Sequence, residues 1–553
     1  MTMTGGQALV GQLGREGVRH VFGIPGVQLD WAVDALRQSR EHIAYLVPRH
    51  EQTASYMADG YARTTGREGV CMVVPGPGVL NALSGLATAY ACSSRLLFIA
   101  GQIPSAALGR GHGLLHEIPD QSGILRSLTK WHALAHSADE VAAVVSEAFH
   151  QLRSGQPRPV AIELPADVLQ ARTAAPLRDA ALACPTRPDP ALIGQAACGL
   201  REARFPVIQA GGGAAAADAG AALARLAEQL QAPVVMTEGG RGVLPDRHPL
   251  ALSSLGGRAV FPHADLVLVV GSRFLDGQGV PTHTAGDCRF IYVNLDPAHA
   301  SAPRRPGLSI LADARVTSES LLEALQGTPV RPSRAEQIEA VKRWCRLQLE
   351  HIEPQTHFVR SVRQALPADG ILVSELTQVG YFANLAFPVE APRTFLTPGY
   401  QGTLGYGFPT ALGAAAGNPH RRVLCLTGDG GFGWAMQELS TAARYRLKLT
   451  VVVFADGRFG NVHRIQQRVF GETFATQLTN PDFAQLAAAF GVAYRRADSA
   501  DALTDAVAGA CEFEGPCLIE VRVGEMPSPW ALIHPFVPSS VPTPPNPLGE
   551  PGA

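Results

Sequence analysis

Short apolar runs alternate with Ala-rich, helix-forming stretches along almost the whole chain, and this alternation constrains the fold more than any other feature. Strands that alternate with helices build parallel sheets whose two faces are covered by helices. The fold class that we predict is therefore α/β, with doubly wound parallel sheets. The predicted strands lie at residues 20–22, 43–47, 70–74, 96–100, 206–210, 234–237, 266–270, 290–294, 371–374, 423–427, 449–455 and 517–521.

Pro-rich stretches with few periodic apolar residues interrupt this alternation near residues 174–190 and 327–335. Such stretches are typical of linkers between domains. We expect three doubly wound domains, each long enough to bury a core of its own, and a mobile C-terminal tail. The predicted segments are a first domain at 1–173, a central domain at 190–328, a third domain at 350–526 and a Pro-rich tail at 527–553.

Charge and cysteine usage exclude several classes of protein. The chain has 46 Lys and Arg against 48 Asp and Glu, a balance that favours neither nucleic acid nor an anionic membrane as a partner. Its nine cysteines are scattered without a CxxC pair, which argues against a zinc site and against a disulfide framework. No apolar run reaches the length of a membrane span, and no signal peptide is recognisable. We expect a soluble, cytoplasmic protein.

The strongest local signal is a glycine-rich turn between two predicted strands. Gly428-Asp429-Gly430 follows one strand, and Asp456 follows the next strand, 27 residues after Asp429. Carboxyl ends of parallel strands share one edge of a sheet, so we expect the two acids to lie close together. A helix expected at 434–444 would direct its N-terminus toward an anion. Carboxylates, a carbonyl and phosphate oxygens are the ligands that Mg²⁺ prefers.

These residues resemble the thiamine-diphosphate binding motif, in which GDG is followed one crossover later by an Asn pair. The pair is Ala455-Asp456 here. The resemblance implies that Asp429 and Asp456 are metal ligands and that the carbonyl of Arg458 is a third. Aspartate in place of asparagine adds a negative charge beside the diphosphate, which either raises metal affinity or weakens cofactor binding at low metal.

A second motif, Arg49-His50-Glu51-Gln52, precedes a predicted helix at 53–63. It resembles the first-domain signature of the group that contains acetolactate synthases, benzaldehyde lyases and oxalyl-CoA decarboxylases. The resemblance implies that Glu51 is catalytic and hydrogen-bonds N1′ of the cofactor's aminopyrimidine, which promotes loss of the thiazolium C2 proton. That chemistry needs a carboxyl group with a shifted pKa in a dry pocket.

The glycine-rich segment 398–409 resembles the family loop that holds the cofactor's aminopyrimidine. The resemblance implies that the backbone of Gly402 receives the 4′-amino group. It also implies that Leu404 props the cofactor into its bent form, an orientation effect that brings the amine toward C2; both residues count as catalytic. The remaining residues predicted to bind the diphosphate are Thr377, Gln378, Gly430, Gly431, Phe459 and Gly460.

The predicted substrate pocket matches no single subgroup. Gln28 stands where benzaldehyde lyases carry His, and His116 replaces a Gln of acetolactate synthases. His116 is either an acid/base or carboxylate-binding group or a structural histidine. The predicted pocket residues are Val27, Gln28, Pro75, His112, His116, Asn461, Val462 and Ile465, of which Gln28 and His116 are also candidates for catalysis.

The central segment carries two further resemblances. Gly277 stands where acetolactate synthases have an arginine that helps to hold the second 2-oxo acid, which argues against true acetolactate synthesis. Gly211-Gly212-Gly213 and Asn294-Leu295-Asp296-Pro297 resemble places where relatives hold FAD or ADP. A glycine-rich turn without a full GxGxxG is a weak signal, so a bound nucleotide and a vestigial domain both stay open.

Together these resemblances predict a thiamine-diphosphate- and Mg²⁺-dependent, non-oxidative decarboxylase or carboligase of 2-oxo acids, similar to acetolactate synthase. A lyase similar to benzaldehyde lyase, 2-hydroxyacyl-CoA lyase or oxalyl-CoA decarboxylase is the alternative. An FAD-dependent oxidase of the pyruvate-oxidase type and a non-catalytic homologue that only binds cofactor also stay open. Glu51 and Asp429 lie in different domains, and in this family each site is built from two chains. The resemblance therefore implies a homodimer or homotetramer.

Overall fold

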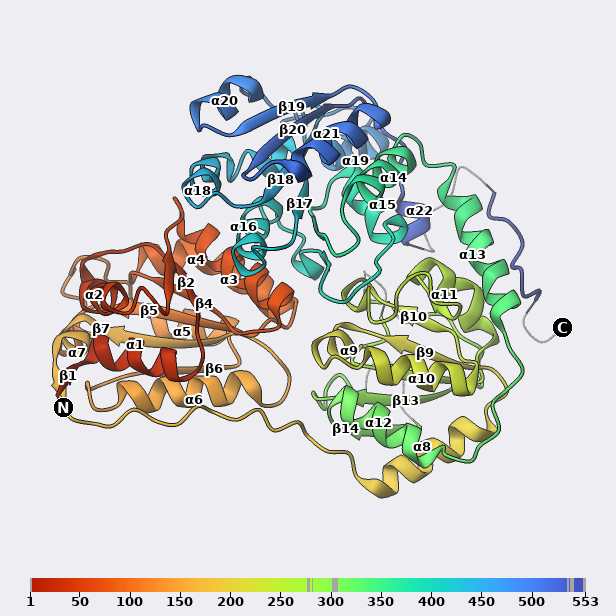
Figure 1. The fold of residues 1–553 in the computed structure, drawn as a ribbon, viewed down its shortest axis with the longest axis horizontal. Coiled ribbons are helices and arrows are strands. Elements are labelled where there is room, and N and C mark those ends of the chain that lie inside the picture. The colour runs from red at the N-terminus through yellow and green to blue at the C-terminus, as the bar shows by residue number, and fades with distance from the viewer. Residues whose placement is uncertain are drawn as a thin grey trace.

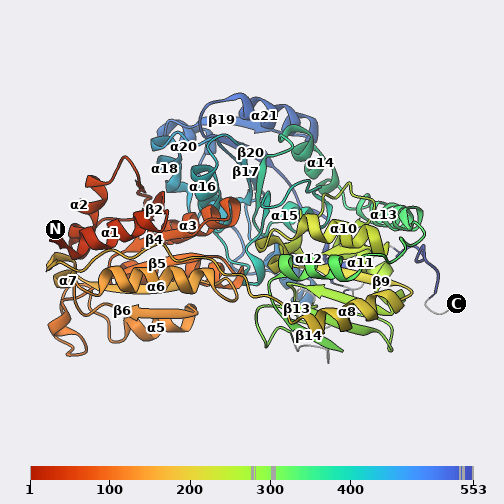
Figure 2. The same cartoon turned by 60° about the horizontal axis from the view of Figure 1, so that its bottom comes forward.

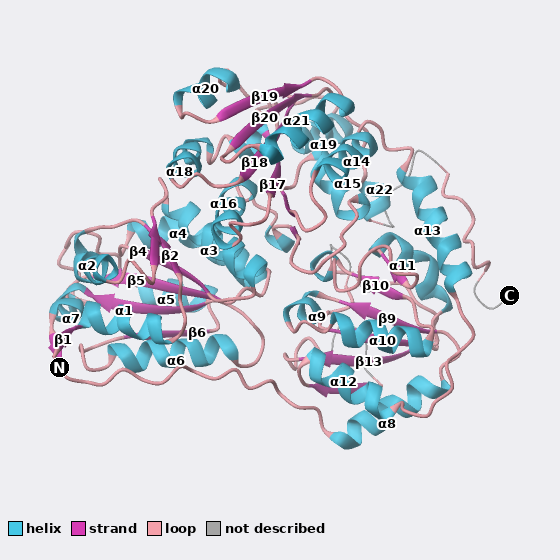
Figure 3. Ribbon diagram, in the orientation of Figure 1, coloured by secondary structure: helices cyan, strands magenta, loops and turns pink. Residues whose placement is uncertain are grey.

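The computed structural model describes residues 2–275, 279–280, 282–300, 307–534, 537 and 542–550. Three parallel six-stranded sheets, each with helices on both faces, form three domains (Figures 1 and 3). The predicted α/β class with doubly wound sheets is confirmed. Every predicted strand forms, because each is a run of mostly apolar residues, and most of these runs are buried on both faces of their sheets.

The first domain is built on the sheet with strand order β3-β2-β4-β5-β7-β6. Its strands are β2 (His20–Gly23), β3 (Ala44–Leu46), β4 (Gly69–Val73), β5 (Leu96–Gln102), β6 (Trp131–Leu134) and β7 (Val160–Pro165). Its helices are α1 (Gly5–Arg15), α2 (Asp30–Gln38), α3 (Glu51–Thr65), α4 (Pro77–Ala91), α5 (Gln121–Leu128), α6 (Val141–Arg153) and α7 (Ala166–Gln170). A separate antiparallel pair joins β1 (Met3–Thr4) to β8 (Arg172–Thr173).

The central domain has strand order β11-β10-β9-β12-β13-β14, the arrangement of dinucleotide-binding folds. Its strands are β9 (Pro206–Ala210), β10 (Val234–Met236), β11 (Ala251–Leu252), β12 (Leu266–Val270), β13 (Arg289–Asn294) and β14 (Leu308–Leu311). Its helices are α8 (Pro190–Glu202), α9 (Gly212–Ala216), α10 (Gly220–Leu230), α11 (Ser254–Val260) and α12 (Ala314–Ala324), and α13 (Ala335–Leu349) leads onward to the third domain.

The third domain has strand order β16-β15-β17-β18-β20-β19. Numbered within each domain, its strands follow the same order as those of the first domain. They are β15 (Ile371–Ser374), β16 (Phe395–Leu396), β17 (Val423–Gly428), β18 (Leu449–Ala455), β19 (Ala493–Ala497) and β20 (Cys517–Arg522). The helices are α14 (Gln355–Ala365), α15 (Gln378–Ala386), α16 (Gly407–Gly417), α17 (Asp429–Phe432), α18 (Leu439–Arg444), α19 (Gly460–Phe470), α20 (Phe483–Ala489), α21 (Ala500–Glu512) and α22 (Trp530–Ile533).

The expected helix at 434–444 is wrong in its start and in its continuity. A four-residue helix, α17, begins directly at Asp429, a 3-10 turn follows at Met436–Glu438, and α18 covers only Leu439–Arg444. Gly430, Gly431 and Gly433 suggested a loop, whereas in the fold they continue the backbone as a helical turn. The N-terminus of this turn therefore lies at the aspartate itself.

The first and third domains pack directly on one another through α3 and α16 (Figure 2). A Cβ atom built on Gly60 would lie 2.1 Å from the carbonyl oxygen of Thr410, and one on Gly413 would lie 1.9 Å from that of Met57. Only glycine permits this approach. The buried faces of both helices join one apolar core shared by the two domains. The segment 174–189 runs from the first domain to the central domain along the outside of the molecule (Figure 1).

Described residues of the C-terminal segment, such as Pro544 and Asn546, contact the body of the protein. The Trp344 indole donates to the carbonyl of Pro544 (2.9 Å), and the Asn546 side chain donates to that of Ala259 (3.1 Å). Within the described part of the chain, no helix combines the length and the apolar composition that crossing a membrane requires.

Candidate active site

Two loops of the third domain meet where the strand order reverses between β15 and β17, the place where open α/β sheets bind ligands. Gly428 ends β17 and Asp429 begins α17, so the aspartate stands at this edge. A Cβ atom built on Gly428 would lie 3.3 Å from the methyl group of Thr377. The turn that follows β15 therefore packs against the Gly428-Asp429-Gly430 turn.

Asp429 is buried, and both of its carboxylate oxygens accept hydrogen bonds. Its Oδ1 accepts a hydrogen bond from the amide of Gly430 (3.0 Å), and its Oδ2 accepts from the amide of Gly457 (2.8 Å). The side-chain amide of Asn480 donates to the same Oδ2 (2.6 Å). Because Gly457 is the neighbour of Asp456, the two acids lie at one edge, as their spacing predicted.

Asp456 is half-buried, and its carboxylate lies beside that of Asp429. Burial raises the pKa of Asp456, and the negative charge of Asp429 raises that pKa further. The amide of Arg458 donates to Asp456 Oδ1 (3.2 Å), and the Arg458 guanidinium stands 3.9 Å from Oδ2. Two neighbouring carboxylates are a fitting pair of ligands for a divalent cation.

Gly430 and Gly460 have no side chains, so the space beside the acids and the backbone at this edge stays open to a ligand. A Cβ atom on Gly460 would lie 2.7 Å from Asp456 Oδ2, and one on Gly430 would lie 3.1 Å from the Phe459 ring. Among the described residues, no three His, Cys, Asp or Glu side chains gather as a metal site. Two carboxylates and one carbonyl thus need further oxygen donors, and a diphosphate supplies them. The residues present fit both groups.

The two residues after β15 have distinct roles in the fold. Thr377 caps α15 by accepting a hydrogen bond from the amide of Gly380 (3.0 Å). The Gln378 side chain reaches toward α19, because its Oε1 accepts from the Arg464 guanidinium (2.8 Å) and its amide nitrogen lies 3.6 Å from a Cβ atom built on Gly460. Both residues therefore lie at the predicted diphosphate edge.

A buried carboxylate that the sequence analysis missed joins the cofactor loop to this edge. Glu375 accepts hydrogen bonds from the amide of Gly405 (2.7 Å) and from the Thr427 hydroxyl (2.6 Å). Burial raises the pKa of Glu375 against the effect of these donors. Gly431 packs so tightly that a Cβ atom there would lie 2.2 Å from the Glu375 carboxylate. Glu375 is a single acid directly after a strand and belongs to no recognisable motif, so nothing in the sequence predicted its role.

The loop that carries Gly402 and Leu404 is anchored at both ends by one arginine of the first domain. The Arg63 guanidinium donates to the carbonyl of Thr397 (2.8 Å) and to the hydroxyl of Tyr406 (2.9 Å). Between these anchors Gly402 has φ +54°, a left-handed conformation that suits glycine. Leu404 keeps 39% of its surface exposed. The loop therefore presents a left-handed glycine and a partly exposed apolar side chain between two fixed ends.

Glu51 opens α3, where the side chain of His50 caps the helix by accepting from the amide of Gln52 (3.1 Å). The Glu51 carboxylate accepts a hydrogen bond from the side chain of Asn81 on α4 (3.0 Å). A cavity of about 460 Å³ opens beside this pair, lined by α3 and α4 on one side and by residues of the third domain such as Trp434 on the other. Glu51 thus stands at an open face between the two domains.

Three loops of the first domain that carry predicted pocket residues lie close together. Gln28 donates from Nε2 to the carbonyl of Leu115 (3.3 Å), next to His116. A Cβ atom on Gly76, the neighbour of the buried Pro75, would lie 2.4 Å from the carbonyl oxygen of His116. The Nδ1 atom of His116 and the Oε1 atom of Gln28 are buried without a partner among the described residues. Val27 is exposed beside Gln28, and His112 lies exposed on the same loop as His116.

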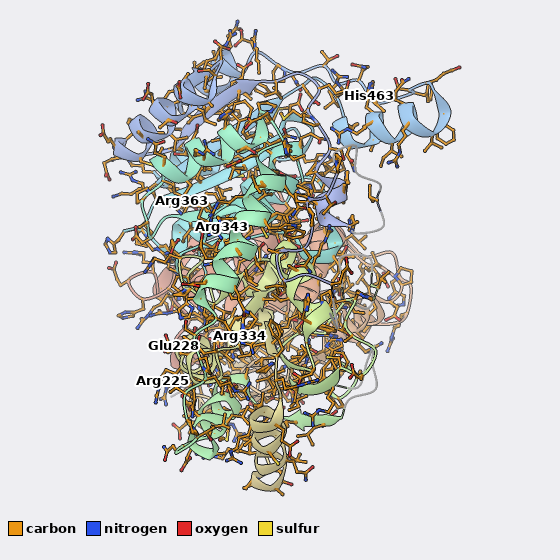
Figure 4. All side chains as sticks on the ribbon, turned by 90° about the vertical axis from the view of Figure 1, so that its right-hand side faces the viewer. Arg225, Glu228, Arg334, Arg343, Arg363 and His463 are labelled. Carbon is orange, nitrogen blue, oxygen red and sulfur yellow. The ribbon has the colours of Figure 1, made fainter. Side chains whose placement is uncertain are left out.

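The remaining predicted pocket residues lie on α19, which projects from the body and carries the labelled His463 (Figure 4). Asn461 accepts a hydrogen bond from the indole of Trp530 (3.0 Å), a residue of the C-terminal segment. Val462 and Ile465 are exposed. The Trp530 contact was missed, because a Pro-rich tail gives no periodic signal.

The glycines of the central domain are explained in part by packing. Cβ atoms on Gly211 and Gly213 would lie 2.3 Å from the carbonyl oxygen and 2.7 Å from the Cα of Gly271, so both positions need glycine for the close approach of two turns. Asn294 donates to the carbonyl of Ser272 (3.3 Å) at the same edge. Binding of FAD or ADP here stays a prediction. Gly277 lies outside the described residues.

Sequence comparisons match this arrangement domain by domain. The N-terminal TPP-binding domain of thiamine pyrophosphate enzymes matches residues 3–124, the central domain matches 193–325 and the C-terminal TPP-binding domain matches 376–521. The chain belongs to the thiamine pyrophosphate enzyme family. Its cofactor is accordingly thiamine diphosphate, as the sequence motifs predicted. The precise domain limits stay predictions.

Relatives within this thiamine pyrophosphate enzyme family cover nearly the whole chain. A probable 2-ketoarginine decarboxylase of Pseudomonas aeruginosa is 37% identical, over 94% of each chain. An acetolactate synthase of Arthrospira platensis is 32% identical and the large subunit of acetolactate synthase isozyme 1 of Escherichia coli is 33% identical, each over 96% of both chains. The predicted class, an enzyme that forms or breaks carbon–carbon bonds as 2-oxo-acid decarboxylases and carboligases do, is confirmed.

Proposed function

We propose that this enzyme is a Mg²⁺- and thiamine-diphosphate-dependent decarboxylase of a 2-oxo acid with a side chain longer than that of pyruvate. The observation that carries the proposal is the combination of the Asp429–Asp456 edge with Glu51 in a chain similar, over 94% of its length, to a probable 2-ketoarginine decarboxylase. The exposed aliphatic side chain of Ile465, a predicted pocket residue, supports a pocket with room for a longer substrate.

Asp429, Asp456 and the carbonyl of Arg458 would hold the metal ion. The backbone amides of Gly431 and Gly460 and the side chains of Thr377 and Gln378 would hold the diphosphate. The predicted contacts through the amides of Gly430 and Phe459 are not available in this conformation, because these amides donate to Asp429 Oδ1 (3.0 Å) and to the carbonyl of Thr476 (2.8 Å). When bound, thiamine diphosphate supplies the carbon nucleophile and the electron sink for loss of carbon dioxide. The protein holds the cofactor and the substrate in position and balances their charges.

Glu51 would hold a proton at the aminopyrimidine, with its carboxyl group oriented by Asn81. Gly402, in its left-handed conformation, would accept the amino group through its backbone carbonyl. Leu404 would support the bent form of the cofactor by contact. The pocket formed by the loops of Gln28, Pro75 and His116 would receive the substrate, and the unpartnered Nδ1 of His116 is the polar atom available to its carboxylate.

The same proposal requires two chains. Every side chain of α19 is at least partly exposed, and three exposed apolar residues, Val469, Phe470 and Phe474, lie at its C-terminal end and just beyond it in the chain. Phe470 is 74% exposed and Phe474 is 86% exposed, which is unusual for a monomer and typical of an interface. We assign this surface, and the cavity beside Glu51, to contact with a second copy of the chain in a homodimer or in a tetramer of two such dimers.

The test is product analysis with the purified full chain, Mg²⁺ and thiamine diphosphate. We expect release of carbon dioxide and one equivalent of aldehyde from 2-ketoarginine, with slower turnover of pyruvate. Formation of acetolactate or another carboligation product from pyruvate would instead assign the enzyme to the synthases. Tight cofactor binding with no carbon dioxide released from a panel of linear, branched and aromatic 2-oxo acids would disprove the proposal.

A further inference from the structure

A buried carboxylate lies beneath the pocket loops of the first domain and has no place in the chemistry described so far. Glu163 on β7 is fully buried. It accepts hydrogen bonds from the side-chain amides of Gln102 (2.8 Å) and Gln121 (2.7 Å), from Nε2 of His132 (2.6 Å) and from the hydroxyl of Ser122. Removing a carboxylate from water is costly, and a fully satisfied buried network of this kind specifies one arrangement of its members.

The charge of Glu163 decides which way the amide of Gln121 points. An ionised carboxylate only accepts hydrogen bonds, so Gln121 must turn its nitrogen toward Glu163. The second hydrogen of that nitrogen goes to the carbonyl of Gly101 (3.0 Å). The Oε1 atom of Gln121 is then left to accept from the amide of Gly76 (2.8 Å). Both the nitrogen and the oxygen of the Gln121 side chain therefore have defined partners.

Gly76 connects the hydrogen-bond network of Glu163 to the predicted substrate pocket. Its φ is +59°, and it lies against His116 so closely that a Cβ atom would stand 2.4 Å from the His116 carbonyl oxygen. His116 itself has φ +68°, a conformation that is uncommon for residues other than glycine. A rotation of the Gly76 peptide would therefore displace the backbone of His116.

We propose that Glu163 is a positioning residue of the substrate pocket, which acts through the amide of Gln121 to fix the Pro75-Gly76 turn and the backbone of His116. The inference rests on the proposed function, because that function makes these residues neighbours of the substrate. Glu163 touches no reacting atom. It affects how the pocket residues are placed around the substrate. It does not affect the diphosphate edge in the third domain.

The test compares Glu163→Gln, Gln121→Ala and the double variant in the full chain with Mg²⁺ and thiamine diphosphate. We expect each single variant to lower kcat/KM for the 2-oxo acid by about 10- to 100-fold, the order of loss that misplacing a substrate causes. Cofactor affinity, read from quenching of tryptophan fluorescence, should stay within about twofold. The double variant should lose no more than Gln121→Ala alone, because Glu163 acts through Gln121.

Glu520→Gln is the matched control. Glu520 is also a buried carboxylate on a strand, held by the Tyr494 hydroxyl (2.6 Å) and by Arg522 (2.7 Å), in the third domain. It should keep wild-type kcat/KM. Multiplicative losses in the double variant, or wild-type kcat/KM in Glu163→Gln, would overturn the inference while the proposed function stands. If Glu163→Gln does not fold, unchanged kcat/KM in Gln121→Ala overturns it equally. Absence of decarboxylation by the wild-type enzyme would overturn both.

Discussion

Gly60 of α3 and Thr410 of α16 approach so closely that a methyl group on the glycine would lie 2.1 Å from the threonine carbonyl oxygen. The two helices come from different domains of one chain. The first begins at Glu51, and the second follows the loop of Gly402 and Leu404. This contact therefore fixes how the two predicted parts of the catalytic site are oriented within each chain.

Gly60→Ala should lower the free energy of unfolding by about 1–3 kcal/mol, since the added methyl group must displace backbone atoms. Urea unfolding measures the change. Gly14→Ala on α1 is the control, because that position has no neighbour within 4 Å. Alanine there should be neutral or stabilising by up to about 1 kcal/mol. Equal stability of the two variants would contradict the close approach.

Glu51→Gln should lower kcat by about 10²- to 10⁴-fold, because glutamine cannot exchange the proton that a carboxyl group exchanges. Steady-state decarboxylation measures kcat, and isothermal titration measures binding of Mg²⁺ and thiamine diphosphate. Binding should change little. The exposed Glu41→Gln serves as control. Full activity in Glu51→Gln would remove Glu51 from the reaction.

Asp456→Asn tests the two effects left open for the extra charge. Since Asp429 already disfavours the charge of Asp456 in the absence of a cation, we expect the pair to favour metal. The variant should bind Mg²⁺ about tenfold more weakly, as fewer ligand charges imply, with activity restored at saturating Mg²⁺. Metal titration followed by tryptophan fluorescence provides the measurement, with the exposed Asp498→Asn as control. Tighter Mg²⁺ binding by Asp456→Asn would support the opposite effect.

The pKa of Glu163 predicts how its contribution to stability depends on pH. Burial alone would raise this pKa, but hydrogen bonds from His132, Ser122 and Gln121 outweigh burial and lower it. A carboxyl group with a lowered folded-state pKa stabilises the fold above its unfolded value of about 4.3 and loses that contribution as the pH falls through the folded value. The stability difference between wild type and Glu163→Gln should shrink on acidification from pH 6. A difference independent of pH would contradict the shift.

Phe470→Glu should dissociate the proposed dimer, because the charge would be placed in an apolar contact. Analytical ultracentrifugation should show a smaller species, and kcat should fall with it. Leu182→Glu is the control, since Leu182 is 83% exposed on the segment that joins the first and central domains. An unchanged sedimentation profile for Phe470→Glu would exclude this surface from the interface.

The sequence predicted well that Asp429 and Asp456 lie at one edge of the sheet, because both follow long apolar strands, where parallel topology leaves little freedom. Asp429 and Asp456 came together for that reason. Asn480 was missed although it binds Asp429, since it lies in an irregular segment whose path no periodicity predicts. Glu375 was missed because a lone acid after a strand carries no distinctive spacing. The broken helix after Asp429 was mispredicted because its glycines disfavour a helix, and tertiary packing overrode that preference.

The first and third domains share one strand order, so the reversal between their first and third strands is an equivalent place in each. The first domain places the Val27 and Pro75 loops there, and the third places the Thr377 and Asp429 turns there. Under the proposed function, the turns for the diphosphate therefore lie at this edge of the third domain, and the loops of Val27 and Pro75 for the substrate lie at the equivalent edge of the first. Under the proposed function, exchanging the loops at residues 24–28 and 109–117 for those of a relative should redirect substrate choice and leave the diphosphate-binding turns of the third domain intact.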